Sequence, residues 1–118
     1  MNSDREDLGV RTRRFALQSI RLSKSIERSE EGSILRRQFL RSSTSIGAQY
    51  REARRARSDA EFISKMESAS QEIDESLYWL ELLDDANLAP KPNITPVYAE
   101  ANELMAIFTT IVRNRKRQ

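Results

Sequence analysis

The stretch SDAEFISKMESASQEIDESLYWLELL, residues 58–83, decides the fold class. Ser58 is followed three residues later by Glu61, the pattern of a capping box, in which a hydroxyl and a carboxylate satisfy unpaired backbone N–H groups at a helix start. Apolar residues then recur on one helical face: Phe62, Met66, Ala69, Ile73, Leu80 and Leu83. This spacing predicts a long amphipathic helix with one buried face.

A second amphipathic helix is predicted just before this one, from about Ile34 to Ala56. On a helical wheel, its apolar positions fall within an arc of about 60°. They are Leu35, Phe39, Ile46, Tyr50 and Ala53. The connection around Arg57 and Ser58 is short, so we expect the two helices to be antiparallel neighbours.

Two further helices are predicted on either side of this pair. The first runs from about Asp7 to Arg28, with Phe15, Leu22 and Ile26 on its apolar face, and Gly32 is expected to mark the following turn. Prolines break the chain between Asn87 and Thr95. Thr95 as N-cap and Pro96 in the first turn are expected to start the last helix. Its apolar face contains Val97, Ala101, Leu104, Phe108 and Ile111, widened by Met105 and Val112.

Four helices with short connections predict an all-α fold, an antiparallel up-down four-helix bundle. A chain of 118 residues is long enough for one domain with a core and too short for two ordinary ones. We therefore expect a single domain over residues 1–118, ending in the basic tail RNRKRQ.

Composition argues against an enzyme. The chain contains neither cysteine nor histidine, which removes thiolate chemistry and the usual general base near neutral pH. Glu72 and Glu75, with Asp74 between them, could suggest a carboxylate metal site. Such bundle sites also use histidine, so a structural or salt-bridging role is favoured. No catalytic residue, metal or cofactor is expected.

The longest uncharged stretch near the C-terminus, Leu104 to Val112, has about half the length of a membrane span. The N-terminus is charged and has no apolar signal region. These features predict a cytoplasmic protein without a membrane partner.

Charge is divided unevenly along the chain. Residues 1–57 carry 14 basic and 7 acidic side chains, whereas residues 58–112 carry 2 basic and 11 acidic ones. The tail adds four basic residues. This asymmetry predicts a basic surface from the first half and the tail. The alternative is that basic and acidic helices neutralise each other, within one bundle or between subunits.

The arginines of the second helix form a stripe within about 140° on the side opposite its apolar face. Because arginine binds phosphate through several donors, this stripe and the tail are candidate phosphate contacts. The candidates are Arg36, Arg37, Arg41, Arg51, Arg54, Arg55, Arg113, Arg115, Lys116 and Arg117. A solvated face, or pairing with the acidic third helix, is the alternative. The aromatic residues of a base-stacking surface are missing.

Two other features concern packing. The run from Ser42 to Ala48, which includes Gly47, is weak in helix propensity, and close approach of another helix is the simplest explanation. On the third helix, Tyr78 and Leu82 lie opposite the apolar face and, with Trp79 at their edge, are candidates for a subunit interface.

Residues 40–83 resemble the four-helix-bundle family named for 23S rRNA intervening sequences, a family similar to the accessory variability proteins of diversity-generating retroelements. The resemblance rests on Arg41 to Ala48, on Tyr50 to Ala53, on Ser58, Phe62, Lys65 and Met66, and on Glu75 and Tyr78 to Leu83. Gln49 departs from it, because many relatives carry asparagine there.

The resemblance implies a ring-shaped homopentamer without enzymatic activity. It also implies nucleic acid as a partner, and a reverse transcriptase or another protein as a second one. The leading interpretation is therefore a noncatalytic, oligomeric protein that binds RNA or other nucleic acid. The alternative is a structural or adaptor module that binds protein and whose charge asymmetry serves self-assembly.

Overall fold

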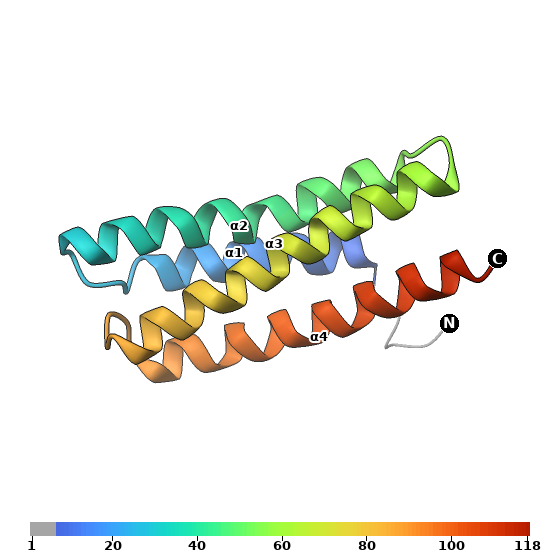
Figure 1. Cartoon of the computed structure of the whole chain (residues 1–118). Coiled ribbons are helices and arrows are strands. Elements are labelled where there is room, and N and C mark those ends of the chain that lie inside the picture. Colours follow the sequence, from blue (N-terminus) through green and yellow to red (C-terminus); the bar gives the residue numbers. More distant parts are fainter. Residues whose placement is uncertain (1–6) are drawn as a thin grey trace.

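The computed structural model describes residues 7–118, which form four helices (Figure 1). They are α1 (Leu8–Ser23), α2 (Glu30–Arg54), α3 (Asp59–Asp85) and α4 (Lys91–Lys116). Each helix packs on its neighbours in chain order, and the seam between α2 and α3 is the most extensive. The predicted antiparallel four-helix bundle is confirmed. Its first six residues, which belong to the predicted domain, lie outside the described part.

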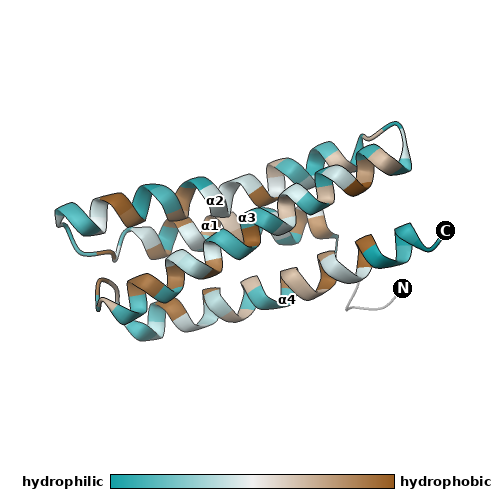
Figure 2. Cartoon of the chain, viewed as in Figure 1, coloured by the Kyte–Doolittle hydropathy of each residue, from teal (hydrophilic) through white to brown (hydrophobic). Residues whose placement is uncertain are grey.

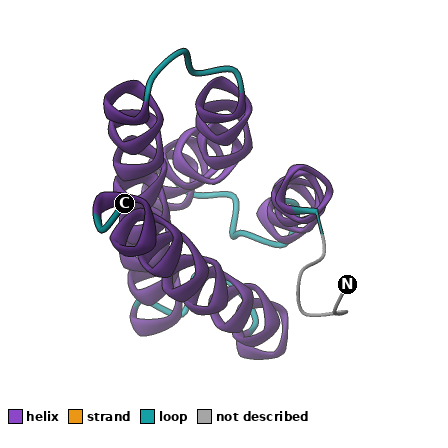
Figure 3. Cartoon of the chain, turned by 90° about the vertical axis from the view of Figure 1, so that its right-hand side faces the viewer, coloured by secondary structure: helices purple, strands orange, loops and turns teal. Residues whose placement is uncertain are grey.

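Contacts at the two ends of the bundle show that successive helices run in opposite directions. At one end, the backbone N–H of Glu27 in the α1–α2 connection donates to the carbonyl oxygen of Leu88 in the α3–α4 connection, at 2.8 Å. At the other end, the side chain of Arg115 in the last turns of α4 reaches Asp59 at the start of α3, at 3.0 Å. The end-on view in Figure 3 shows the helices side by side around a common interior.

The core consists of the predicted apolar faces. Phe15, Phe39 and Phe108 are fully buried and come from three different helices. In Figure 2 the hydrophobic residues recur as separate patches along each helix, between hydrophilic turns, as an amphipathic period requires. The sequence interpretation missed Ser76 and Leu77 of α3, which are also buried.

The start of α3 is as predicted. The hydroxyl of Ser58 accepts a hydrogen bond from the backbone N–H of Glu61 at 3.1 Å. The Glu61 carboxylate in turn accepts from the backbone N–H of Arg57 at 2.8 Å. This donor is one residue earlier than in the usual capping box, but both side chains satisfy backbone groups at the helix start.

The predicted turn at Gly32 is wrong. The α2 helix begins at Glu30, four residues earlier than expected, and Gly32 lies in its first turn. Ser29 is the N-cap, and its hydroxyl accepts from the backbone N–H of Gly32 at 3.0 Å. The glycine is needed for close approach, since a Cβ atom there would lie 2.0 Å from the carbonyl oxygen of Glu27.

The predicted start of the last helix is also wrong. The α4 helix begins at Lys91 with Pro90 as N-cap, and Pro96 lies inside the helix. The Thr95 hydroxyl donates to the carbonyl oxygen of Lys91 at 3.0 Å instead of capping a helix end. The chain turns before α4 at Asn87, which has a positive φ of 56°.

The first helix is shorter than predicted. It ends at Ser23 rather than near Arg28, yet Ile26 in the following connection is only 2% exposed and belongs to the core. The regular spacing of apolar residues therefore continues past the end of the helix. In the described part of the chain, no helix combines the length and the apolar character needed to cross a membrane.

Candidate nucleic-acid interface

Arg36, the first arginine of the predicted stripe, holds the connection between α1 and α2. Its guanidinium donates to the backbone carbonyl oxygens of Ser23 at 3.2 Å, Ile26 at 2.9 Å and Glu27 at 3.3 Å. Carbonyls near a helix end lack intrahelical partners, so a basic side chain is favourable there. This side chain already has an intramolecular role, and its donors are largely occupied.

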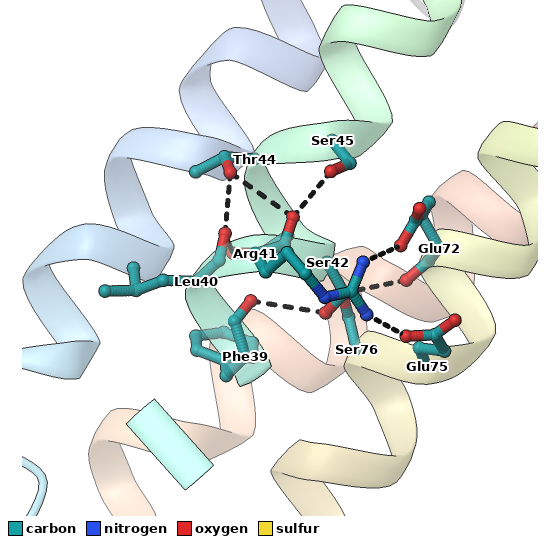
Figure 4. Close-up of polar contacts among 10 residues, drawn as sticks. Phe39, Leu40, Arg41, Ser42, Thr44, Ser45, Glu72, Glu75 and Ser76 are labelled. Carbon is teal, nitrogen blue, oxygen red and sulfur yellow. Dashed lines mark hydrogen bonds and ion pairs between the residues drawn. The ribbon is translucent and has the colours of Figure 1, made fainter. Parts of the chain in front are cut away.

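Arg41 pairs with the acidic third helix (Figure 4). Its guanidinium lies 3.3 Å from the Glu72 carboxylate and also contacts Glu75. The hydrogen bond to Glu75 raises the pKa of the arginine above its ordinary value. The salt-bridging role expected for these carboxylates is confirmed, and at this position the stripe meets the bundle's own acidic helix.

Small residues beside Arg41 bring the helices close together. The buried hydroxyls of Ser42 and Ser76 are hydrogen bonded between α2 and α3 at 2.8 Å (Figure 4). A Cβ atom on Gly47 would lie 3.2 Å from the hydroxyl oxygen of Thr12 on α1. The hydroxyls of Thr44 and Ser45 donate to carbonyl oxygens of the preceding turn, each at 2.6 Å. The predicted packing role of this run is confirmed.

Gln49 of α2 carries a buried polar atom without a partner in the described part of the chain. Its side-chain oxygen Oε1 is buried and accepts no hydrogen bond from residues 7–118. The indole N–H of Trp79 is likewise buried and has no acceptor in that range.

The C-terminal half of α2 borders a groove against the beginning of α1. The groove has a volume of about 970 Å³. Arg51 and Arg54 of α2 and the C-cap residue Arg55 line it, together with Arg13 of α1. The sequence interpretation missed Arg13, although the run RTRR at residues 11–14 indicated a basic start to the first helix.

Two carboxylates also line this groove, and both have partners. Glu52 lies 2.7 Å from the ammonium group of Lys65 on α3. Asp7 is the N-cap of α1, accepts from the backbone N–H of Gly9 at 2.7 Å and lies 3.7 Å from the Arg54 guanidinium. Arg13, Arg51 and Arg55 have no ion-pair partner among residues 7–118. The groove therefore has an excess of positive charge.

The basic tail is partly paired. Arg115 lies 3.0 Å from Asp59 and stacks over the ring of Phe62, with its guanidinium carbon 3.9 Å from the ring centroid. Lys116 lies 3.0 Å from the carboxylate of Glu67. Arg113 and Arg117 are exposed and have no ion-pair partner in the described part of the chain.

These basic segments meet at one end of the molecule. The beginning of α1, the end of α2 and the end of α4 all lie at the same end of the bundle (Figure 1). We call this region the basic end, defined by Arg51, Arg54, Arg55, Arg113, Arg115, Lys116 and Arg117. Arg36, Arg37 and Arg41 belong to the opposite half of α2, so the predicted stripe divides into two parts.

The candidate subunit interface lies on α3. Tyr78 is 54% exposed, and its ring centroid lies 5.2 Å from that of Trp79. Leu82 is half-buried, while Trp79 packs against the core. The patch is small and centres on the exposed face of one aromatic ring.

Across residues 7–118, no group of three or more acidic side chains is arranged to hold a metal ion. A second, smaller hollow of about 390 Å³ is lined by Ser70, Gln71, Asp74 and Glu75 of α3. Glu75 is already paired with Arg41, so this hollow offers no separate set of ligands.

Comparison with known proteins places this chain in a family. Residues 7–110 match the family described as 23S rRNA-intervening sequence protein. A similar solved structure is that of a protein of unknown function from the S23 ribosomal protein family of Bacteroides thetaiotaomicron VPI-5482. It has a TM-score of 0.82 and 32% sequence identity, over 88% of this chain and 96% of that chain. No curated protein matches the chain.

Proposed function

Because the chain belongs to the 23S rRNA-intervening sequence protein family, we propose that it is a noncatalytic protein that binds RNA through the basic end of its bundle. The observation that carries this proposal is the convergence of unpaired arginines from separate helices. Arg51 of α2 and its C-cap residue Arg55 lie at the same end as Arg113 of α4 and the tail residue Arg117. A cluster of this kind attracts a polyanion more strongly than isolated surface charges do.

Intramolecular pairing limits which residues contribute to binding. Arg36 and Arg41 are held by backbone carbonyls and by carboxylates of α3, so we assign them minor roles. Arg115 and Lys116 are each paired with one carboxylate near the start of α3. Their exposed pairs are weak enough to exchange for phosphate contacts.

The experiment is a titration of labelled single-stranded RNA with the full chain, followed by fluorescence anisotropy at several salt concentrations. Affinity should fall steeply as salt rises, because each neutralised phosphate releases counterions. Charge reversal by Arg51→Glu, Arg54→Glu and Arg55→Glu should lower affinity at least tenfold. Lack of binding by the unaltered chain at low salt, or no effect of the triple reversal, would refute the proposal.

A second candidate function is a structural or adaptor module that assembles with itself. The observation that favours it is the exposed Tyr78 ring beside the half-buried Leu82, on the helix that also carries nine of the chain's 18 acidic residues. The family resemblance adds a homopentamer as the expected assembly. Native mass spectrometry tests this candidate. The double substitution Tyr78→Ala with Leu82→Ala should reduce the mass of the assembly to that of smaller species. An unchanged native mass would contradict the assignment of the interface to these residues.

We further propose a cytoplasmic location and a protein partner. A reverse transcriptase is the candidate partner, because the sequence resembles the accessory variability proteins of diversity-generating retroelements. Purification of the tagged chain from its own cells, with measurement of the ultraviolet absorbance ratio and identification of co-purifying proteins, separates the two candidates. Co-purifying nucleic acid supports the RNA-binding function, whereas a nucleic-acid-free protein complex supports the adaptor function.

A further inference from the structure

We propose that the groove between α1 and α2 holds the sugar-phosphate backbone of a single polynucleotide strand. This inference rests on the proposed nucleic-acid binding and assigns it to one place. The groove is open to solvent, has a volume of about 970 Å³ and lies between the first turns of α1 and the C-terminal half of α2. A space of this size accommodates a ligand of a few nucleotides.

Small residues in the lining let the sugar-phosphate backbone of a bound strand come close to the two helices. Gly9 and Ala16 of α1, and Gly47 and Ala48 of α2, contribute little or no side chain to its lining. The two helices are already in contact here, because Gly47 packs against Thr12. A ligand in the groove therefore meets helix backbone and short side chains, with longer side chains around them.

Arginines from both helices supply the phosphate contacts. Arg13 comes from α1, Arg51 and Arg54 come from α2, and Arg55 is the C-cap residue of α2. Arginine presents several N–H donors in a planar group, which suits phosphate oxygens. Two carboxylates also line the groove: Glu52 pairs with Lys65 of α3, and Asp7 pairs with Arg54. Arg13, Arg51 and Arg55 have no ion-pair partner among residues 7–118, so the lining keeps an excess of positive charge.

The concave shape of the groove favours binding of a single strand over binding of a duplex. A duplex is stiff, with a persistence length of about 50 nm, and carries its phosphates on a convex surface. It can contact the rim of the groove but cannot follow its lining. A single strand bends easily and can place successive phosphates between Arg13 on one side and Arg51, Arg54 and Arg55 on the other.

If the groove contacts the sugar-phosphate backbone, we expect binding to depend little on the nucleotide sequence. Tyr50 is the aromatic residue that lines the groove, and its ring already packs near Phe108, with 5.9 Å between centroids. The Arg54 guanidinium lies 5.9 Å from the same ring. Since single-strand proteins that stack bases use several free aromatic faces, contacts here are expected to be with phosphate and sugar. RNA and DNA strands then differ only through the 2′-hydroxyl.

The first test fills the groove without changing charge. Ala48 is an exposed residue of α2 that lines the groove, and Ala106 is an exposed residue of α4 outside it. Ala48→Trp should weaken binding of a single-stranded RNA oligonucleotide at least tenfold, whereas Ala106→Trp should change it less than twofold. Circular dichroism and thermal melting confirm that both variants are folded.

The second test removes equal charge inside and outside the groove. Arg51→Gln with Arg55→Gln should lower affinity at least tenfold and reduce the salt slope by about 1.4, from about 0.7 for each phosphate contact on a single strand. Arg28→Gln with Arg37→Gln changes the net charge equally at exposed positions that lie outside both the groove and the basic end. This control pair should lower affinity less than threefold.

The outcomes separate the groove from the general function. If the unaltered chain binds no nucleic acid at low salt, the proposed function itself fails. If it binds but the two tryptophan variants behave alike, or the two glutamine pairs do, the groove assignment fails and the proposed function stands. Tighter binding of a duplex of the same length than of single-stranded RNA or DNA also overturns the groove assignment.

Discussion

At Gly32, a Cβ atom would lie 2.0 Å from the backbone carbonyl oxygen of Glu27 and 3.1 Å from its carbon. The obstacle is backbone, which cannot move aside without displacing the connection between α1 and α2. At Gly9, the nearest obstacle is the flexible end of the Arg54 side chain, at 3.0 Å. Both glycines lie in the first turn of a helix, yet only Gly32 is required by a rigid neighbour.

Gly32→Ala should therefore lower the free energy of unfolding by about 2 kcal/mol or more, the usual scale for overpacking a tight site. Gly9→Ala should change it by less than about 1 kcal/mol, because alanine favours helix and the arginine can move. Urea denaturation of both variants measures the difference. Similar losses for the two substitutions would contradict this explanation of Gly32.

Because Tyr50 is partly buried, its contribution to the free energy of unfolding depends on pH. Desolvation raises the pKa of its phenol above the ordinary value of 10.0, although Arg54 opposes the shift. The folded state thus favours the neutral phenol, and its contribution to stability is complete below pH about 10 and is lost as pH rises through the folded pKa. Tyr50→Phe should weaken the decline in unfolding free energy above pH about 10. Identical pH profiles for the variant and the unaltered chain would exclude this contribution.

At the scale of one helix, Arg36 stabilises the end of α1 and the connection that follows. It reaches three carbonyl oxygens, although it belongs to α2. Arg37 is exposed, and its side chain makes no hydrogen bond or ion pair with residues 7–118. Neighbouring arginines in one helix therefore have different roles, because only one of them faces the end of α1.

Arg36→Ala should lower the free energy of unfolding by about 1–2 kcal/mol, the scale of hydrogen bonds from a charged donor. Arg37→Ala should stay within about 0.5 kcal/mol of the unaltered chain, as usual for surface positions. Hydrogen exchange should quicken in the last turn of α1 only for the first variant. Exchange that is unchanged there would show that the arginine does not hold the helix end.

At the scale of the whole molecule, the seam between α1 and α4 is the least extensive of the four. It is held by Arg11, whose guanidinium lies 2.7 Å from Glu100 and 2.8 Å from Glu103. The Arg11 and Glu100 side chains are 13% and 20% exposed, whereas Glu103 is 67% exposed. Two well-shielded charges form the main polar link between the first and last helices.

Arg11→Ala should lower the free energy of unfolding by about 2 kcal/mol, since it leaves the shielded Glu100 without its partner. Glu100→Gln should cost more than Glu103→Gln, because solvent screens the exposed pair. Thermal and urea denaturation of the three variants provide the ranking. An equal cost for the two glutamate substitutions would show that shielding does not matter at this seam.

The sequence could predict a large part of this architecture because the relevant signals are local. An apolar period of 3.6 residues depends only on neighbouring positions, and the buried faces of α2, α3 and α4 follow it. Helix starts were less certain, since a hydroxyl can either cap a helix or donate to the preceding turn. Ser58 takes the first role and Thr95 the second. Gly32 was misleading because close packing and turns both select glycine.

Sequence alone thus determined the fold class, the buried faces and the presence of a basic stripe. Only the tertiary structure decided what each basic side chain meets. Arg41 finds Glu72 at a separation of 31 residues, and Arg115 finds Asp59 at a separation of 56. Arg51 and Arg55 instead border a groove completed by the beginning of α1. The physical reason is that helix period is a property of one segment, whereas an ion pair or a groove requires two segments whose relative placement is set by packing.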